Sequence, residues 1–265
     1  MKQVIAMCLV ALLVPLWACP AQAVVSLGGT RLVFDGRFRE ATLDVSNPGQ
    51  AQVLIQAWIA KPGAAPSAQA DLPFVLTPHL AQIPAMGRHR LRVLYEGVGM
   101  PLDRESLLHL YVLEVPRRSE ARQQLNIAVR QRINVFYRPK GLAGDPADVP
   151  LRLRWQRGTP DSHTLSVRNP TPFHASLLNI AFNGVEVSED LMIEPFSERL
   201  LPLPKTLPEG LSRLAGEGCL SFKALTDYGG QRDFSTQGHD SEPFTARLRD
   251  ASGRTLASPQ FIEKC

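Results

Sequence analysis

The residues of this sequence that are best suited to chemistry are cations at alternate positions of one segment. Residues 125–138 read LNIAVRQRINVFYR, and Arg130, Arg132 and Arg138 fall on one face if this segment is an extended strand. Three guanidinium groups on one face of a strand need partners. The chemistry that this pattern offers is therefore charge pairing.

The opposite face of the same segment is apolar. Its positions are Leu125, Ile127, Val129, Gln131, Ile133 and Val135, of which only the glutamine is polar. Such alternation is typical of a half-buried strand whose apolar side packs in a core while its arginines face water. The periodicity alone favours this interpretation, because it does not reveal an exposed strand.

Catalytic and metal-binding chemistry lacks its usual components. The histidines are scattered and show no paired spacing such as His-Glu-x-x-His: His79, His89, His109, His163, His174 and His239. The sequence also has no Gly-x-Ser-x-Gly elbow and no phosphate-binding loop. We therefore predict a protein that is not an enzyme and that uses no cofactor and no metal.

The first 23 residues have the pattern of a secretory signal peptide. Lys2 precedes an apolar run over residues 4–17, and Ala-Gln-Ala at residues 21–23 matches a cleavage site. Lipidation at Cys19 is the alternative, but Trp17 is too bulky for a lipoprotein cleavage box. We favour the signal peptide, and we expect an exported protein without a membrane anchor.

Loss of this leader leaves Cys219 and Cys265 as the cysteines of the exported chain. Two thiols in an oxidising compartment usually pair. The sequence therefore makes Cys219 and Cys265 candidates for a structural disulfide.

The charge of the exported chain is only mildly basic. Removal of Lys2 lowers the formal net charge from +4 to +3, since the leader contains no acid. The three arginines within residues 117–122 lack interleaved aromatic residues, so we interpret them as part of a solvated loop. We expect no nucleic acid among the partners.

Short runs of Val, Ile, Leu and Phe between Asn-Pro, Pro-Gly, Asn-Gly and Gly-Gly turns favour an all-β fold. Strands are expected at residues 41–45, 53–59 and 91–95, with a surface loop over 61–70. The Pro- and Gly-rich residues 139–146 indicate a domain boundary, so we assign domains to residues 24–143 and 144–265. In the second domain we expect strands at residues 151–155, 164–167, 175–182, 200–203, 219–225 and 244–248, which predict a second sandwich.

Five motifs in succession give a resemblance to a known family. They are TRLVFDG at residues 30–36, DRES at 103–106, FYRP at 136–139, NPTP at 169–172 and DYGG at 227–230. Their order and spacing resemble those of periplasmic pilus chaperones of the PapD-like, chaperone–usher kind, and the match fades beyond residue 230. The resemblance implies two immunoglobulin-like β-sandwich domains in a boomerang arrangement. It also implies an ATP-independent chaperone that binds pilus subunits by donor-strand complementation and delivers them to an outer-membrane usher.

The resemblance assigns roles to individual residues. Leu125, Ile127 and Val129 match the alternating donor residues of the family. Arg31 matches the arginine that, together with a lysine, holds the terminal carboxylate of the subunit. Asn134 stands where the lysine is expected, so one anchor charge is missing. We hypothesise that Arg132, on the same face as Asn134, replaces it.

The resemblance further implies an interdomain cluster of Glu105, Arg138 and Asp227. Three unrelated surface charges are the simpler interpretation of the residues alone, whereas their place in three motifs favours a buried cluster that fixes the interdomain angle. The sequence leaves open which subunits are bound and whether the chaperone caps itself by dimerising. It gives no family counterpart for the tail.

A passive adhesin or pilus subunit is the alternative function. A subunit has a donor extension at its N-terminus and an incomplete single domain. The strand pattern here begins within a few residues of Val24 and covers two domains. We therefore favour the chaperone.

Overall fold

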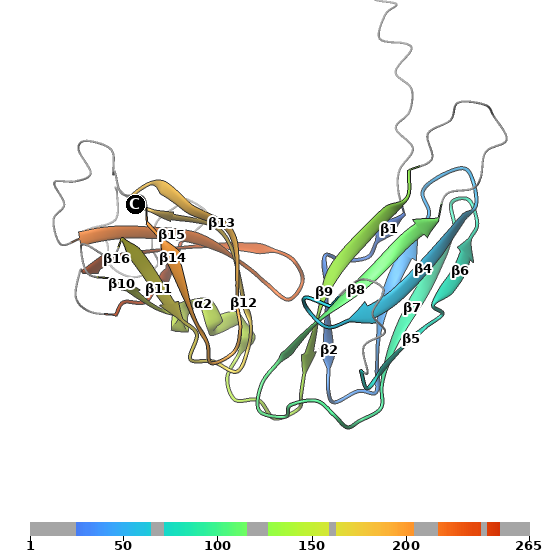
Figure 1. The fold of residues 1–265 in the computed structure, drawn as a ribbon, viewed down its shortest axis with the longest axis horizontal. Coiled ribbons are helices and arrows are strands. Elements are labelled where there is room, and N and C mark those ends of the chain that lie inside the picture. The colour runs from blue at the N-terminus through green and yellow to red at the C-terminus, as the bar shows by residue number, and fades with distance from the viewer. Residues whose placement is uncertain are drawn as a thin grey trace, which may run out of the picture.

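The chain folds into two β-rich domains that meet at an angle (Figure 1). The structure, a computed structural model, describes residues 25–64, 72–115, 127–158, 163–203, 217–239 and 243–249. The predicted signal peptide, Leu125, the loop arginines of residues 117–122 and Cys265 lie outside these ranges. The predicted all-β class with two sandwich-like domains is confirmed.

The N-terminal domain consists of two sheets. The first has the strand order β1 (Ser26–Leu27), β3 (Glu40–Ser46), β7 (Arg88–Tyr95) and β5 (Phe74–Thr77). The second has the order β2 (Arg31–Asp35), β9 (Val129–Arg138), β8 (Ser106–Val115), β4 (Val53–Ala60) and β6 (Leu80–Ile83). Among the described strands of this domain, β2 and β9 pair in parallel and the other pairs are antiparallel.

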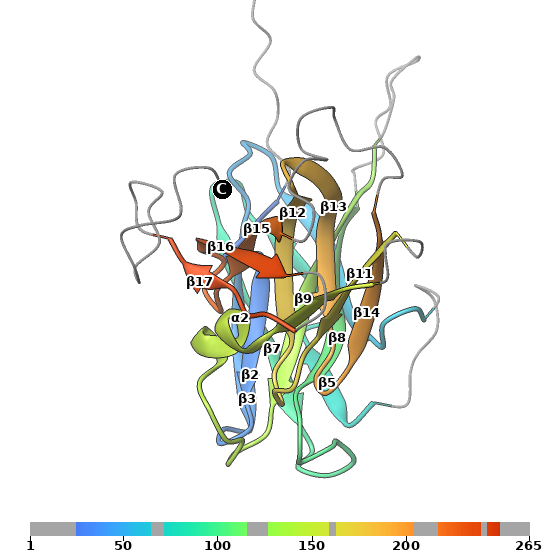
Figure 2. The same ribbon diagram turned by 90° about the vertical axis from the view of Figure 1, so that its left-hand side faces the viewer.

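The C-terminal domain repeats this two-sheet plan and lies in front of the N-terminal domain in Figure 2. One sheet has the order β10 (Arg154–Arg157), β11 (Thr164–Arg168) and β14 (Glu198–Pro202). The other has the order β13 (Val185–Ile193), β12 (Ala175–Phe182), β15 (Glu217–Leu225), β16 (Gln231–His239) and β17 (Arg247–Leu248). The chain beyond residue 230 thus adds two strands to the sheet that contains β15.

Each domain encloses its own hydrophobic core. The period of two along the strands sends alternate side chains inward, where Phe34, Leu110 and Val135 are fully buried in the first core. Trp155 and Phe234 occupy the corresponding place in the second core. The functional surfaces therefore lie on strand edges, on outward faces and at the junction of the domains. Within the described residues, no helix combines the length and the apolar composition that a membrane span requires.

The connection between the domains corrects one prediction. The strand expected over residues 151–155 begins only at Arg154, because the preceding residues form a 3₁₀ turn, η2 (Pro146–Asp148), and a single helical turn, α2 (Val149–Arg152). The Asp145 carboxylate accepts the Ala147 N–H at 2.8 Å, and a proline occupies the first turn of each segment. Both features favour helix initiation.

Candidate functional site

The N-terminal half of β9 has an open edge. β8 pairs with β9 from Val129 to Tyr137, whereas β2 pairs only with residues 134–138 on the other side. The backbone of residues 129–133 therefore has no strand partner on the β2 side among the described residues. In Figure 1, β9 lies on the side of the N-terminal domain that faces the C-terminal domain. An open edge of this kind is a template for a strand from another chain.

The apolar face of β9 changes its environment along this edge. Ile133 and Val135 are 5% and 0% exposed and belong to the domain core. Val129 is only partly buried, and Ile127, just before the strand, is 66% exposed. The C-terminal half of this face therefore packs in the core of the domain. Its N-terminal half projects beyond the core, and the donor role concerns this half.

The arginines on the outward face of β9 have different environments. The Arg130 guanidinium lies over the Tyr111 ring at 5.5 Å, and Tyr111 stacks on Trp58 at 5.3 Å. Arg132 is exposed and does not line the cleft between the domains; it borders a shallow hollow of about 590 Å³ next to residues 25–30. Only Arg138, at the end of the strand, reaches the other domain.

Arg31 lies in a cleft of about 400 Å³ between the domains. It pairs in register with Asn134, and its guanidinium lies over the Phe136 ring at 5.5 Å. Nη1 donates to Ser176 Oγ at 3.4 Å, a long hydrogen bond, and the buried Nε has no acceptor among the described residues. Burial lowers the pKa of Arg31, although the nearby charges of Asp227 and Glu105 partly oppose this.

Arg31 is thus a half-buried cation without an ion pair in the described part of the chain. Burial of a charge without a partner is costly. A carboxylate that entered the cleft would supply the missing acceptors. The arrangement is suited to binding an anion.

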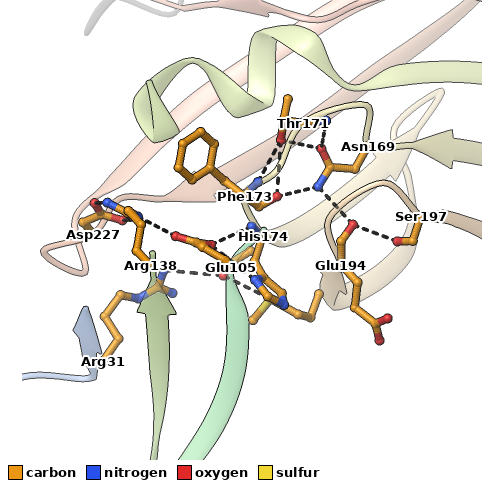
Figure 3. Close-up of polar contacts among 12 residues, drawn as sticks. Arg31, Glu105, Arg138, Asn169, Thr171, Phe173, His174, Glu194, Ser197 and Asp227 are labelled. Atoms are coloured by element: carbon orange, nitrogen blue, oxygen red, sulfur yellow. Dashed lines mark hydrogen bonds and ion pairs between the residues drawn. The ribbon is translucent and has the colours of Figure 1, made fainter. Parts of the chain in front are cut away.

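Arg138 joins the two domains, as Figure 3 shows. Its Nε donates to Glu105 at 2.6 Å, and its two terminal nitrogens donate to the two oxygens of Asp227 at 2.7 and 2.9 Å. Burial alone would lower the pKa of Arg138, but the two carboxylates outweigh it and the pKa is raised. The structure therefore brings the three residues of the predicted cluster together.

Three further contacts of Glu105 were not predicted from the sequence. Its carboxylate accepts the backbone N–H of His174 at 2.8 Å and contacts the His174 ring at 3.2 Å, and its own N–H donates to the Pro172 carbonyl at 2.8 Å. Glu105 is 3% exposed, so these are buried links between the domains.

The NPTP motif explains how the second domain presents these groups. The buried Asn169 amide donates to the carbonyls of Phe173 and Glu194, and its oxygen accepts from the backbone and hydroxyl of Thr171. This network fixes the loop that carries the Pro172 carbonyl and the His174 N–H (Figure 3). The motif itself was the signal that could have pointed to the loop.

The DYGG motif forms the tip of the β15–β16 hairpin, which approaches β2. Gly229 has φ +81°, and a Cβ on this residue would lie 2.9 Å from Thr30 Oγ1. Only glycine adopts this conformation without cost and allows so close an approach. The hairpin is thereby held beside the residue that precedes Arg31.

We expect Gly229→Ala to destabilise the protein by more than Gly184→Ala. The left-handed conformation costs an alanine about 1–2 kcal/mol at either position. Gly184 has φ +74° but nothing within 4 Å, so only Gly229→Ala also meets Thr30. Thermal unfolding of the two variants measures the difference, and adding Thr30→Ala to Gly229→Ala should remove it. Equal stability of the two single variants would contradict the close approach of Gly229 to Thr30.

Cys219 lies near the start of β15 and is disulfide-bonded. Its predicted partner, Cys265, lies outside the described residues, so the pairing of these two cysteines stays a prediction.

The comparisons with known proteins agree with this geometry. Residues 24–143 match the family described as "Pili and flagellar-assembly chaperone, PapD N-terminal domain", and residues 148–236 match "Pili assembly chaperone PapD, C-terminal domain". The Bordetella pertussis chaperone protein FimB/FhaD is 35% identical over 79% of this chain and 86% of its own length. The probable fimbrial chaperone YadV of Escherichia coli is 31% identical over 77% of this chain and 85% of its own.

Solved structures give the same result. The crystal structure of the YadV chaperone has a TM-score of 0.65 at 28% identity and covers 80% of this chain and 98% of its own. The Salmonella enterica SafA pilin in complex with the SafB chaperone gives a TM-score of 0.66 at 28% identity, with coverages of 87% and 98%. The similarity includes both domains.

Proposed function

The chain belongs to the family of PapD-like chaperones of pilus assembly, and we propose that it captures fimbrial subunits with the open edge of β9 and the cleft arginine Arg31. The observation that carries this proposal is an exposed Ile127 just before β9, followed by a backbone that has no strand partner on the β2 side among the described residues. The neighbour on that side, β2, carries Arg31. The recognition of an extended strand and the binding of an anion are thereby combined along one edge of the sheet.

Donor-strand complementation accounts for the first part. A sandwich that lacks its last strand exposes apolar core and unpaired backbone groups, which is an aggregation hazard in water. The backbone of residues 129–133 supplies hydrogen bonds, while Ile127 and Val129 fill the groove together with Leu125, which lies outside the described residues. Binding of this kind forms no covalent bond and needs no ATP, so the proposal includes no catalytic activity.

The anchor at Arg31 accounts for the second part. Burial of the donor side chains contributes about 1.5–3 kcal/mol each, and a hydrogen bond to a charged group about the same. Affinity therefore rests mainly on the groove. The anchor sets the register, since a slip of one residue would turn Ile127 and Val129 away from the subunit.

Arg132 is our candidate for the second anchor charge, in place of the lysine that the family has at the position of Asn134. Its Cα is about 7 Å from that of Asn134, a distance that a long side chain spans in part. Both residues lie on the outward face of β9.

We expect Arg31→Ala to lose subunit capture and Arg132→Ala to weaken it. Loss of a charge-assisted hydrogen bond of about 1.5–3 kcal/mol corresponds to roughly 10- to 100-fold in affinity. Capture is measured by co-purification of a fimbrial subunit that is co-expressed with each variant. Arg130→Ala is the matched control, since it removes the same charge from the same face two residues further from Asn134. Normal capture by Arg132→Ala would show that Arg132 does not replace the lysine.

We propose the periplasm as the compartment and delivery to an outer-membrane usher as the next step. A periplasmic chaperone, SfaE, has a TM-score of 0.62 to this chain at 25% identity and supports the location. The usher is expected for chaperones of this family.

A further inference from the structure

His109 occupies a place on the outward face of the second sheet that the proposed function does not use. It pairs in register with Asn134 of β9, which in turn pairs with Arg31 of β2. Residues paired in register project to the same face of a sheet. Arg31, Asn134 and His109 therefore form a row across three neighbouring strands, which lie about 4.8 Å apart.

The imidazole of His109 is buried, and one of its two ring nitrogens lacks a partner among the described residues. The residue is 8% exposed, and its Nδ1 is inaccessible to solvent without a hydrogen bond to any described residue. The Tyr111 ring lies edge-on to the imidazole at 6.1 Å. A buried polar atom without a partner is costly unless a ligand satisfies it.

The charges that face His109 are few. On β9 these are Arg132 and, beyond Asn134, no further charge until Arg138; on β4 its register partner is Ala60, and on β8 the adjacent outward residues are Leu107 and Tyr111. Arg31 lies two strands away. Burial lowers the pKa of His109, and the positive charge of Arg132 lowers it further. The unliganded imidazole is therefore neutral at neutral pH.

We propose that His109 is a further subunit-binding residue, which takes up a proton when the terminal carboxylate of the subunit enters beside Asn134 and donates a charge-assisted hydrogen bond to it. This inference rests on the proposed function of Arg31. The proton comes from solvent, so neutral imidazole, one proton and a carboxylate give an imidazolium–carboxylate pair. The missing lysine is thereby replaced by a cation that forms only in the complex, as well as by the permanent charge of Arg132.

Capture should consequently strengthen in acid. A carboxylate raises the affinity of His109 for its proton, so binding takes up at most one proton, and the affinity rises at most tenfold for each unit by which the pH falls. As the pH falls, the affinity begins to rise at the titration midpoint of His109 in the complex. It stops rising below the titration midpoint of His109 in the free chaperone. The carboxylate of the subunit titrates only at about pH 3.5, well below this range.

The test uses the full chain in complex with a fimbrial subunit that it captures in co-expression. The His109 imidazole is titrated by NMR in the free chaperone and in the complex, and its midpoint should rise by about one pH unit or more. The rate of subunit release should fall about tenfold between pH 7.5 and pH 5.5 for the wild-type chaperone. Circular dichroism at both pH values verifies that each variant is folded.

Two variants isolate His109. His109→Gln should show less than a twofold change in release rate between the two pH values. Asn134→Lys, which restores a permanent cation at the adjacent position, should show slow release at both. An unchanged midpoint in the complex, or an undiminished pH effect in His109→Gln, would overturn the role of His109 while leaving the proposed function intact. A wild-type chaperone that captures no subunit would instead refute the proposed function.

Discussion

Ile127→Asp is expected to abolish subunit capture without unfolding the chaperone. Ile127 is 66% exposed in the free protein, so its replacement changes the folding free energy by less than about 0.5 kcal/mol. In the complex the side chain fills the apolar groove of the subunit. The variant then loses about 1.5–3 kcal/mol of burial and places a carboxylate in a dry site. The loss of affinity should exceed about 100-fold, since each 1.4 kcal/mol is a factor of ten.

Val75→Asp is the matched control for this experiment. Val75 is 50% exposed and lies on β5, the edge strand of the other sheet of the same domain. Both variants add the same charge at an exposed apolar position next to an open edge. Co-purification should fail only for Ile127→Asp, and thermal unfolding should match the wild type for both. Unfolding of Ile127→Asp would instead assign residue 127 to the core, and capture by it would refute the donor role.

The donor edge illustrates what alternation predicts and what it does not. The period of two places Ile127, Ile133 and Val135 on one face, but it does not say where that face leaves the core. The open edge of β9 depends on where β2 begins, which is opposite Asn134. The first residue of β2, Arg31, lies about 100 residues away from Asn134 in the sequence. Only the resemblance to a family pointed to the half that projects.

Three other elements could not be predicted correctly from the local sequence pattern. In β13, polar and apolar residues share both faces because it is an edge strand of its sheet, so it shows no one-sided pattern. In β16, Phe234 is the one large apolar side chain among the described ones. Neither strand therefore shows the alternation that predicts a strand from the sequence. The strand expected at residue 151 was wrong because the apolar pattern of residues 149–153 equally fits a single helical turn that starts at prolines.

The interdomain contacts are separated too widely in sequence for any local pattern. Arg138 is 33 residues from Glu105 and 89 from Asp227. The motifs therefore identified these three residues through resemblance alone. His109 and His174 show no spacing pattern in the sequence, since a histidine gains significance only from the neighbours that the fold provides.

Arg138→Ala is expected to give the largest loss of stability. The side chain of Glu105 is only 2% exposed, so its carboxylate would keep its burial and lose its cation. Breaking a buried pair from one side costs about 3–5 kcal/mol. Asp227 is 34% exposed and is rehydrated in part, so we expect the lower end of that range. For a chain of this size the melting temperature should fall by roughly 6–12 °C, at 2–4 °C for each kcal/mol.

Two further variants separate charge from packing. Arg90→Ala breaks the exposed Arg90–Asp44 pair and should not change the melting temperature measurably. Adding Glu105→Gln to Arg138→Ala removes the unpaired buried charge and should recover much of the loss, whereas a loss caused by missing packing would persist. Small-angle scattering tests the interdomain angle, which we expect to become variable in Arg138→Ala. A single unchanged interdomain angle would mean that two other contacts of Glu105 suffice to hold the domains together. These are its backbone hydrogen bond to Pro172 and its contacts with His174.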